Sequence, residues 1–332
     1  MFEWIFDRIG IFGNIMVLLL GMLVLDRSSD IAVDNSVKVA EITGLGKMTI
    51  GFLLVALFTT LPELSVSIFS ITDPDTIGVA IGNVLGSNIV NVCLILGLCF
   101  LISVLKKKDG TCRLSRRITE NVRDLFFGLF IASLIPLALI YIGYASNIIG
   151  VILVSIFIAN NVQMIRSKKN VRMDKQYDNL NGEDNMTKHI LLTLLGVAGV
   201  VVSAYFIVET ASRIAEYLGV PKVVIGATVV AFGTSLPELA TGINASMKGH
   251  LELVLGNIVG SGFANITLIL GVALLGAPFR VNMAAYSHLA MFSVITNLLL
   301  WYFLSGERIS WRESMILLFM YMLFITTIFS MR

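Results

Sequence analysis

The feature that most constrains this chain is an internal repeat. The stretch GFLLVALFTTLPELSVSI from Gly51 recurs as GATVVAFGTSLPELATGI from Gly226, and we call the separation of these two glycines the first repeat spacing. The stretch IGNVLGSNIVNVCLILG over 81–97 recurs as LGNIVGSGFANITLILG over 255–271 at a slightly shorter separation, the second repeat spacing. Matches continue upstream of both copies at the first repeat spacing. The repeated unit is therefore about half of the protein.

Ten segments of the chain are long and apolar enough to cross a membrane as helices. About 20 apolar residues are needed to cross a hydrocarbon core of about 30 Å. Only 14% of the residues are charged, where about 25% is usual for a soluble domain. This composition excludes a soluble globular domain, and a net charge of +2 provides no binding surface for nucleic acid. The predicted spans cover residues 11–25, 49–71, 77–105, 125–144, 147–165, 190–212, 223–246, 252–277, 284–304 and 312–331.

The two copies of the repeat have opposite orientations in this arrangement. Matching segments are the second and seventh spans, and the third and eighth, so five crossings separate the copies. An odd number of crossings inverts one copy relative to the other. We therefore expect an all-α polytopic membrane protein with ten transmembrane helices in two inverted five-helix repeats, an architecture typical of secondary transporters. The predicted units are residues 1–165 and 189–332, with the repeated blocks at about 51–98 and 226–272, and a linker loop at 166–188.

The basic residues predict the orientation of the chain in the membrane. With the N-terminus outside, most of the 24 lysine and arginine residues fall in the inner connections. The positive-inside rule then places both termini outside and the 166–188 loop in the cytoplasm of a multi-pass cell-membrane protein. Helical sequence continues past the first and sixth spans to about Gly44 and Gly219, which suits strongly tilted helices. Three cysteines are too few for a disulfide framework, so we expect free thiols.

Two glutamates lie near the middle of repeated spans. Glu63 and Glu238 are each about fifteen residues into the second and seventh spans. A carboxylate at the bilayer centre costs on the order of 2.5–3.5 kcal/mol on insertion scales. No lysine or arginine occurs between residues 48 and 105, and Lys248, at a helix connection, is the one between 223 and 279. The sequence therefore predicts neutralisation by protons or by a bound cation, and two facing carboxylates could neutralise one divalent ion.

Polar residues at helical spacing surround both glutamates. Residues four apart share a helix face, and the repeat contains four such pairs: Thr59 with Glu63, Thr234 with Glu238, Ser87 with Asn91, and Ser261 with Asn265. Pro62 and Pro237 cannot donate to the carbonyls of Phe58 and Gly233, four residues earlier. Transporters use such freed carbonyls to coordinate cations. Ligands that are all oxygen atoms favour Ca²⁺, Na⁺ or H⁺ over zinc or copper.

Simpler interpretations exist for each of these features taken alone. One proline can be only a kink, and one intramembrane glutamate can be a buried protonated acid. The same Thr, Pro and Glu spacing in both copies favours a shared ion site instead. Asp26, Asp30 and Asp34 form a polar face at helical spacing, which fits either a cation pathway or an internally paired face, and the same holds for Glu209.

The repeated blocks resemble the alpha-repeats of a known transporter family. TTLPEL with GNVLGSNIVN, and GTSLPEL with GNIVGSGFAN, are similar to the two alpha-repeats of the sodium/calcium exchanger family, within the cation/calcium antiporters. The resemblance extends over nearly the whole chain and implies a Ca²⁺ site between the two glutamates. It also implies Na⁺ sites formed by the surrounding hydroxyls, amides and carbonyls. The implied ligands are Ala56, Thr59, Thr60, Glu63, Ser87 and Asn91, and Ala231, Thr234, Ser235, Glu238, Ser261 and Asn265, with Ala56 and Ala231 contributing backbone carbonyls.

Some positions depart from the family pattern. Asn265 is neutral where some members carry an acid, and Thr60 stands where serine is usual. Phe58 replaces the usual glycine, and Gly262 stands opposite Asn88 of the first repeat. The central loop lacks the large Ca²⁺-sensing domains of animal exchangers, so the resemblance is to a compact prokaryotic-type member.

The sequence thus predicts an antiporter, not an enzyme, that exchanges Ca²⁺ for Na⁺ by alternating access. H⁺/Ca²⁺ exchange and K⁺-dependent Na⁺/Ca²⁺ exchange are alternatives, and a cation channel is an alternative of a different class. The expected partners are the transported ions and the lipid bilayer, with no nucleic acid and no further cofactor. The sequence leaves the oligomeric state open.

Overall fold

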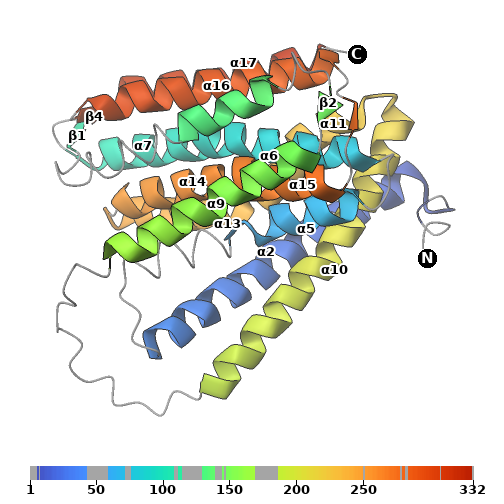
Figure 1. The fold of residues 1–332 in the computed structure, drawn as a ribbon, viewed down its shortest axis with the longest axis horizontal. Coiled ribbons are helices and arrows are strands. Elements are labelled where there is room, and N and C mark those ends of the chain that lie inside the picture. Colours follow the sequence, from blue (N-terminus) through green and yellow to red (C-terminus); the bar gives the residue numbers. More distant parts are fainter. Residues whose placement is uncertain are drawn as a thin grey trace.

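The computed structural model describes most of the chain, and nearly all of the described residues are helical (Figure 1). Ala56, Phe58 and the linker residues 169–185 lie outside the described residues. The structure describes residues 6, 8–42, 59–71, 76–107, 111–113, 129–138, 144–145, 147–168, 186–249, 251–276, 279–280, 283–306 and 308–330.

Helices suited to crossing a membrane dominate the described part of the chain. Six of them are long and apolar enough, and a bent pair, Lys222–Thr234 with Leu236–Met247, adds a seventh if it counts as one span. Shorter apolar helices at Leu129–Ala138 and Asn147–Val162 fall on the fourth and fifth predicted spans. The chain is therefore a polytopic helical membrane protein. The six helices are Gly10–Ala32, Ile77–Leu105, Met186–Leu218, Val254–Gly276, Tyr286–Ser305 and Trp311–Phe329.

Two 33-residue helices, α2 (Gly10–Ile42) and α10 (Met186–Leu218), are the longest elements. They pack against each other and run obliquely to α6, α7 and α17 (Figure 1). Their length confirms the prediction that the first and sixth spans are extended. Helix α10 stops at Gly219, whose φ of +64° is a left-handed conformation that glycine adopts at helix ends without strain.

Glycines at matching repeat positions bring α2 and α10 together. A Cβ on Gly196 of α10 would lie 2.7 Å from the carbonyl oxygen of Ser28 on α2. A Cβ on Gly21 of α2 would lie 3.8 Å from the carbonyl oxygen of Ser203 on α10. Gly21 is related to Gly196, and Ser28 to Ser203, by the first repeat spacing. Each helix therefore touches the other through the same repeated positions.

Three of the predicted spans contain π-helical turns, which loosen the regular helix and are frequent at functional sites. In the third span, η3 interrupts the helix from Val90 onward, and in the eighth, η5 does so from Asn265. These elements are α6 (Ile77–Ile89), η3 (Val90–Ile95) and α7 (Leu96–Leu105); α11 (Lys222–Ile225), η4 (Gly226–Val230), α12 (Ala231–Thr234) and α13 (Leu236–Met247); and α14 (Leu251–Ala264), η5 (Asn265–Ile269) and α15 (Leu270–Gly276).

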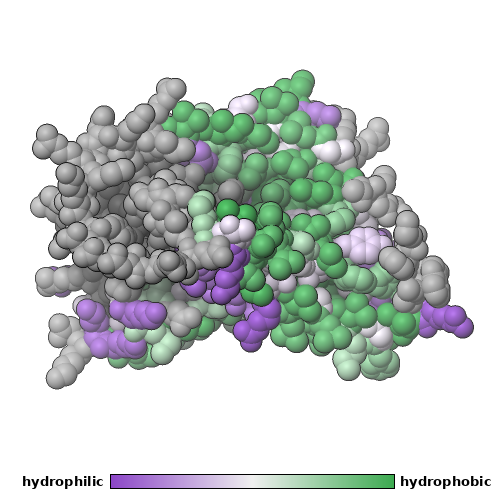
Figure 2. All heavy atoms as spheres, turned by 90° about the horizontal axis from the view of Figure 1, so that it is seen from below, coloured by the Kyte–Doolittle hydropathy of each residue, from purple (hydrophilic) through white to green (hydrophobic). Residues whose placement is uncertain are grey.

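The remaining helices pack against these spans. They are α5 (Leu61–Ser70), Leu129–Ala138, α9 (Asn147–Lys168), α16 (Met283–Ser305) and α17 (Trp311–Phe329). Buried apolar side chains of the third, fourth, seventh, eighth, ninth and tenth spans form one hydrophobic cluster, which includes Leu96, Phe100 and Leu317. Large apolar side chains such as Phe12 and Phe319 are exposed instead. Apolar side chains cover most of the described part of one face of the molecule (Figure 2), as expected for a surface in contact with lipid.

Two short antiparallel strand pairs tie the ends of the helices together. Strand β1 (Thr111–Arg113) pairs with β4 (Arg308–Ser310), and β2 (Tyr144–Ala145) pairs with β3 (Phe279–Arg280). Strands β1 and β4 lie at one end of the molecule and β2 at the other (Figure 1). Helix α17 follows β4 directly and begins with a capping box formed by Ser310 and Glu313.

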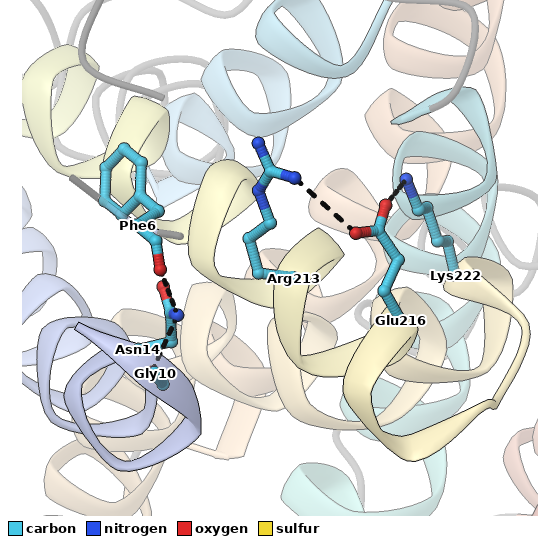
Figure 3. A network of polar contacts seen from close by, with 6 residues as sticks. All are labelled: Phe6, Gly10, Asn14, Arg213, Glu216 and Lys222. Carbon is cyan, nitrogen blue, oxygen red and sulfur yellow. Dashed lines mark hydrogen bonds and ion pairs between the residues drawn. The ribbon is translucent and has the colours of Figure 1, made fainter. Parts of the chain in front are cut away.

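Polar contacts also link the long helices to their neighbours. Glu216, near the end of α10, lies 3.6 Å from Arg213 and 2.8 Å from Lys222 at the start of α11 (Figure 3). In the same view, Asn14 Nδ2 donates to the carbonyl oxygens of Phe6 and Gly10, both at 2.8 Å. Cys93 and Cys99 are free thiols, as predicted, and both are buried.

Candidate ion-binding site

Both mid-membrane glutamates are fully buried in the first turn of a helix. Glu63 lies in α5 and Glu238 in α13, each with an exposed fraction of 0%. The N-terminal end of a helix carries a partial positive charge, which offsets part of the cost of burying a carboxylate there. The span that carries Glu238 is bent by 42° between α12 and α13. This bend lies just before Pro237, whose missing N–H cannot bond to the carbonyl of Gly233.

The carboxylate of Glu63 is held by a residue of the other half of the chain. Ser235 Oγ donates to Glu63 Oε1 across 3.4 Å. Glu63 Oε2 is buried and has no hydrogen-bond partner among the described residues. The backbone carbonyl of Glu63 accepts a bond of 3.4 Å from Asn83 Nδ2. One carboxylate oxygen is thus oriented, and the other is left available.

Glu238 also has one bonded and one unbonded carboxylate oxygen, but its serine comes from its own half of the chain. Ser261 Oγ donates to Glu238 Oε1 at 3.1 Å, while Oε2 is buried without a partner in the described part of the chain. Asn91 Nδ2, from the first half, donates to Ser261 Oγ at 3.3 Å. Three predicted ligands, Asn91, Ser261 and Glu238, are therefore joined in one chain across the two halves.

The threonines of the predicted site bond across the halves as well. Thr234 Oγ1 donates to Asn83 Oδ1 at 3.0 Å and lies 3.4 Å from Ser87 Oγ. Thr59 Oγ1 donates to Asn257 Oδ1 at 3.3 Å. Thr59, Thr234 and Ser87 are fully buried. The structure thus brings these predicted residues into the same polar region as the glutamates.

Asn83 and Asn257 were not among the residues predicted for the site. They are related by the second repeat spacing and occupy the same place in the two repeated blocks, IGNVLGS and LGNIVGS. The repeat contained the signal, because an asparagine retained in both copies within an apolar span is itself costly to bury. Spacing from the glutamates gave no reason to include them, since they approach the site from neighbouring spans.

The other predicted residues lie as follows. Asn265 is fully buried at the start of η5, and both its amide atoms have no partner among the described residues. Thr60 is buried at the N-cap of α5. The carbonyl of Ala231 accepts from Ser235 N–H at 3.1 Å and from Thr234 Oγ1 at 3.3 Å. Ala56 lies outside the described residues, so its predicted role remains a prediction.

The oxygen ligands of the site, and its buried acceptor atoms that lack a hydrogen-bond partner among the described residues, both fit a hard cation. In the described part of the chain, no three histidine, cysteine or acidic side chains gather as a metal site. Buried acceptors that lack a donor are costly, so their presence points to a missing positive partner. Oxygen atoms of this kind suit Ca²⁺ and Na⁺. Among the predicted ligands, the buried acceptors without a partner in the described part of the chain are Glu63 Oε2, Glu238 Oε2, Asn91 Oδ1 and Asn265 Oδ1.

The polar face predicted on the first span has a different environment. Asp26 and Asp30 on α2 are half-buried, and Asp34 is exposed. These aspartates therefore differ from Glu63 and Glu238, which are fully buried.

Comparison with known proteins finds one family along nearly the whole chain. The profile of the family described as sodium/calcium exchanger protein matches residues 13–165 and 188–330. The sodium/calcium exchanger MaX1 of Methanosarcina acetivorans is 32% identical over 345 residues, which cover 95% of this chain and 98% of that protein.

Solved structures give the same result for the fold. A structure of the sodium-calcium exchanger NCX_Mj aligns with a TM-score of 0.65 at 28% identity, over 96% of this chain and 99% of its own. A structure of the H⁺/Ca²⁺ exchanger CAX aligns with a TM-score of 0.76 at 19% identity, over 95% of this chain and 82% of its own. At that identity the second likeness concerns the fold alone.

Proposed function

Because the chain belongs to the sodium/calcium exchanger family, whose members are transporters and not enzymes, we propose that it exchanges Ca²⁺ for Na⁺ across the cell membrane. The observation that carries the proposal is the pair Glu63 and Glu238. Both are fully buried, and each has one carboxylate oxygen bonded to a serine and the other without a partner among the described residues. A divalent cation held between them would neutralise both charges.

Coupling follows from competition for the same carboxylates. An empty site carries two uncompensated charges, which disfavour its passage through the apolar interior. A site loaded with Ca²⁺, or with Na⁺ ions instead, carries less net charge and can change access. Only loaded states then cross, so inward movement of Na⁺ drives outward movement of Ca²⁺. No cofactor besides the transported ions is needed.

The architecture that we propose is ten helices in two inverted five-helix repeats. Three observations support it: the reciprocal contacts of Gly21 and Gly196, the π-helical turns at Asn91 and Asn265, and the two strand pairs. Strand β1 follows the third span and pairs with β4, which precedes the tenth span. Strand β3 follows the eighth span and pairs with β2, which precedes the fifth span. Figure 1 shows β1 and β2 at opposite ends, as inversion requires.

Alternating access would arise from the two long helices. Helices α2 and α10 contact each other closely and are oblique to the other spans (Figure 1). We propose that this pair slides past the other eight helices and opens the glutamate site first to one side and then to the other.

The membrane orientation is also part of the proposal: both termini outside and the 166–188 linker in the cytoplasm. In Figure 1 the start of α2 and the end of α17 lie at one end of the molecule. The end of α9 and the start of α10, which flank the linker, lie at the opposite end. Because both termini lie at one end, this placement supports an even number of crossings for the whole chain. It also supports a linker on the opposite side of the membrane from the termini.

Flux measurements on the purified protein in liposomes test the function. With Na⁺ inside the vesicles and pH clamped, we expect ⁴⁵Ca²⁺ uptake that stops when the Na⁺ gradient is removed. A proton gradient at equal Na⁺ on both sides tests H⁺/Ca²⁺ exchange, and adding or omitting K⁺ tests K⁺ dependence. Uptake that needs no counter-ion gradient would instead identify a channel and overturn the proposal.

A further inference from the structure

Asn83 and Asn257 occupy matching positions in the two repeats, and neither was predicted to be a ligand. Asn83 lies in α6 and Asn257 in α14, related by the second repeat spacing. Both are buried, with exposed fractions of 0% and 7%. Each accepts a hydrogen bond from the site threonine of the opposite half, Thr234 for Asn83 and Thr59 for Asn257.

The hydrogen-bond partners of Asn83 determine which of its amide atoms faces which neighbour. A backbone carbonyl can only accept, so the Asn83 group that lies 3.4 Å from the Glu63 carbonyl must be Nδ2. Asn83 Oδ1 therefore faces Thr234. An amide oxygen can only accept as well, so Thr234 Oγ1 is the donor of the 3.0 Å bond to Asn83. The Ala231 carbonyl, at 3.3 Å, is a second and longer acceptor for the same proton.

The second chain ends on a backbone carbonyl too. Thr241 Oγ1 donates to the carbonyl of Pro237 at 2.8 Å. Thr241 is then an acceptor for Asn257 Nδ2, at 3.4 Å. Asn257 Oδ1 consequently faces Thr59, whose hydroxyl donates to it at 3.3 Å. In the first half the position that matches Thr241 is Val66, so Asn83 uses the backbone of Glu63 directly.

A hydroxyl whose proton is committed can offer only its lone pairs to the site. Hydroxyl groups have one donor and two acceptor positions, and a cation requires the acceptors. A freely rotating hydroxyl would spend part of the time with its proton towards the cation. We propose that Asn83 and Asn257 are positioning residues that hold Thr234 and Thr59 with their lone pairs turned to the transported ion.

This proposal rests on the proposed function, since it assigns a role in binding the transported cation. Because each asparagine acts on the threonine of the other half, it also predicts a specific pattern of coupling. Asn83 is coupled to Thr234 and Asn257 to Thr59, whereas Asn83 with Thr59 is an unmatched pair. A merely structural role of Asn83 would not distinguish the two threonines.

Double-mutant cycles on the apparent KM for Ca²⁺ test the proposal. Asn83→Ala and Thr234→Val should each raise KM about tenfold with a smaller change in maximal rate. The double variant should then be little worse than Thr234→Val, because the asparagine acts through that hydroxyl. Asn83→Ala with Thr59→Val should show the product of the two single effects. Equal, multiplicative effects in both combinations would overturn the proposal.

Controls separate this result from misfolding and from failure of the proposed function. Asn161→Ala removes a half-buried asparagine of α9, whose Nδ2 donates to the Phe157 carbonyl of the same helix at 2.8 Å, and should leave KM within about twofold. If the Asn83 variants do not fold, the mirrored cycle of Asn257→Ala with Thr59→Val makes the same prediction. Absence of gradient-driven Ca²⁺ flux in the unmodified protein would refute the proposed function. Flux with additive cycles would refute only the positioning role.

Discussion

Ser261 connects Glu238 to the first half of the chain. Its hydroxyl donates to Glu238 Oε1 at 3.1 Å and accepts from Asn91 Nδ2 at 3.3 Å. The bond to Asn91 leaves the serine proton available for the carboxylate, so the two bonds support each other. Glu238 is thus oriented by side chains from α14 and from η3, and its second oxygen stays unpaired among the described residues.

Replacing Ser261 by alanine should weaken Ca²⁺ binding. A hydrogen bond to a charged group contributes about 1.5–3 kcal/mol, so we expect a rise in the apparent KM for Ca²⁺ of roughly tenfold or more. Radioactive Ca²⁺ uptake into liposomes measures it. Ser293→Ala is the matched control, because Ser293 is a buried serine of α16 whose Oγ has no partner among the described residues. Equal KM values for the two variants would contradict this role of Ser261.

Neutralising either glutamate should abolish transport and change stability in a specific way. Glu63→Gln and Glu238→Gln keep the size of the side chain and remove the charge that must be compensated. We expect Ca²⁺ flux at background level and a higher melting temperature without cations, because a buried uncompensated charge is destabilising. Ca²⁺ at about 100 times its Kd should stabilise the unmodified protein by about 2.7 kcal/mol, and the glutamine variants should lose that shift.

Glu216 provides the control for these two variants. It is an exposed glutamate that pairs with Arg213 and Lys222 at the end of α10 (Figure 3). Exposed ion pairs contribute about 0–1 kcal/mol. Glu216→Gln should therefore keep both Ca²⁺ flux and Ca²⁺-dependent stabilisation. Full transport by Glu63→Gln would rule out the two-glutamate site.

The sequence identified the candidate ligands of the site better than the contacts between them. Glu63 and Glu238 are identifiable because an acid without a basic partner is rare in an apolar span, and the repeat showed it twice. The lengths of α2 and α10 also followed from the pattern, since helical sequence continues to a glycine. These inferences need only local composition and the spacing between the copies.

What could not be predicted depends on contacts between spans. Asn83 and Asn257 reach the threonines from other helices, so spacing along one helix does not reveal them. The π-helical turns η3 and η5 arise from packing within the bundle, and no residue type in them signals an extra residue per turn. The choice of Ser235, rather than a residue of the first half, as the donor to Glu63 likewise follows from how the halves meet.

Close packing of the third and seventh spans depends on Gly82. A Cβ there would lie 2.2 Å from the Val223 carbonyl oxygen and 2.7 Å from the Ala227 nitrogen, both backbone atoms that cannot rotate away. Gly82→Ala should therefore destabilise the fold by about 1–3 kcal/mol or more, seen as a lower melting temperature in detergent. Gly97→Ala in the same span is the control, because its Cβ would meet the flexible Leu318 side chain at 3.1 Å. Similar melting temperatures for the two variants would contradict this account.

Chemical labelling at the two ends of α10 tests the proposed orientation. Met186 and Tyr217 are exposed near the two ends of this helix. In a background with Cys112→Ser, the native Cys93 and Cys99 are buried and should not react with a membrane-impermeant maleimide. Tyr217→Cys should then be labelled in intact cells, and Met186→Cys only after the membrane is opened. The reverse pattern would place the linker outside, and equal labelling of both in intact cells would mean that α10 does not cross the membrane.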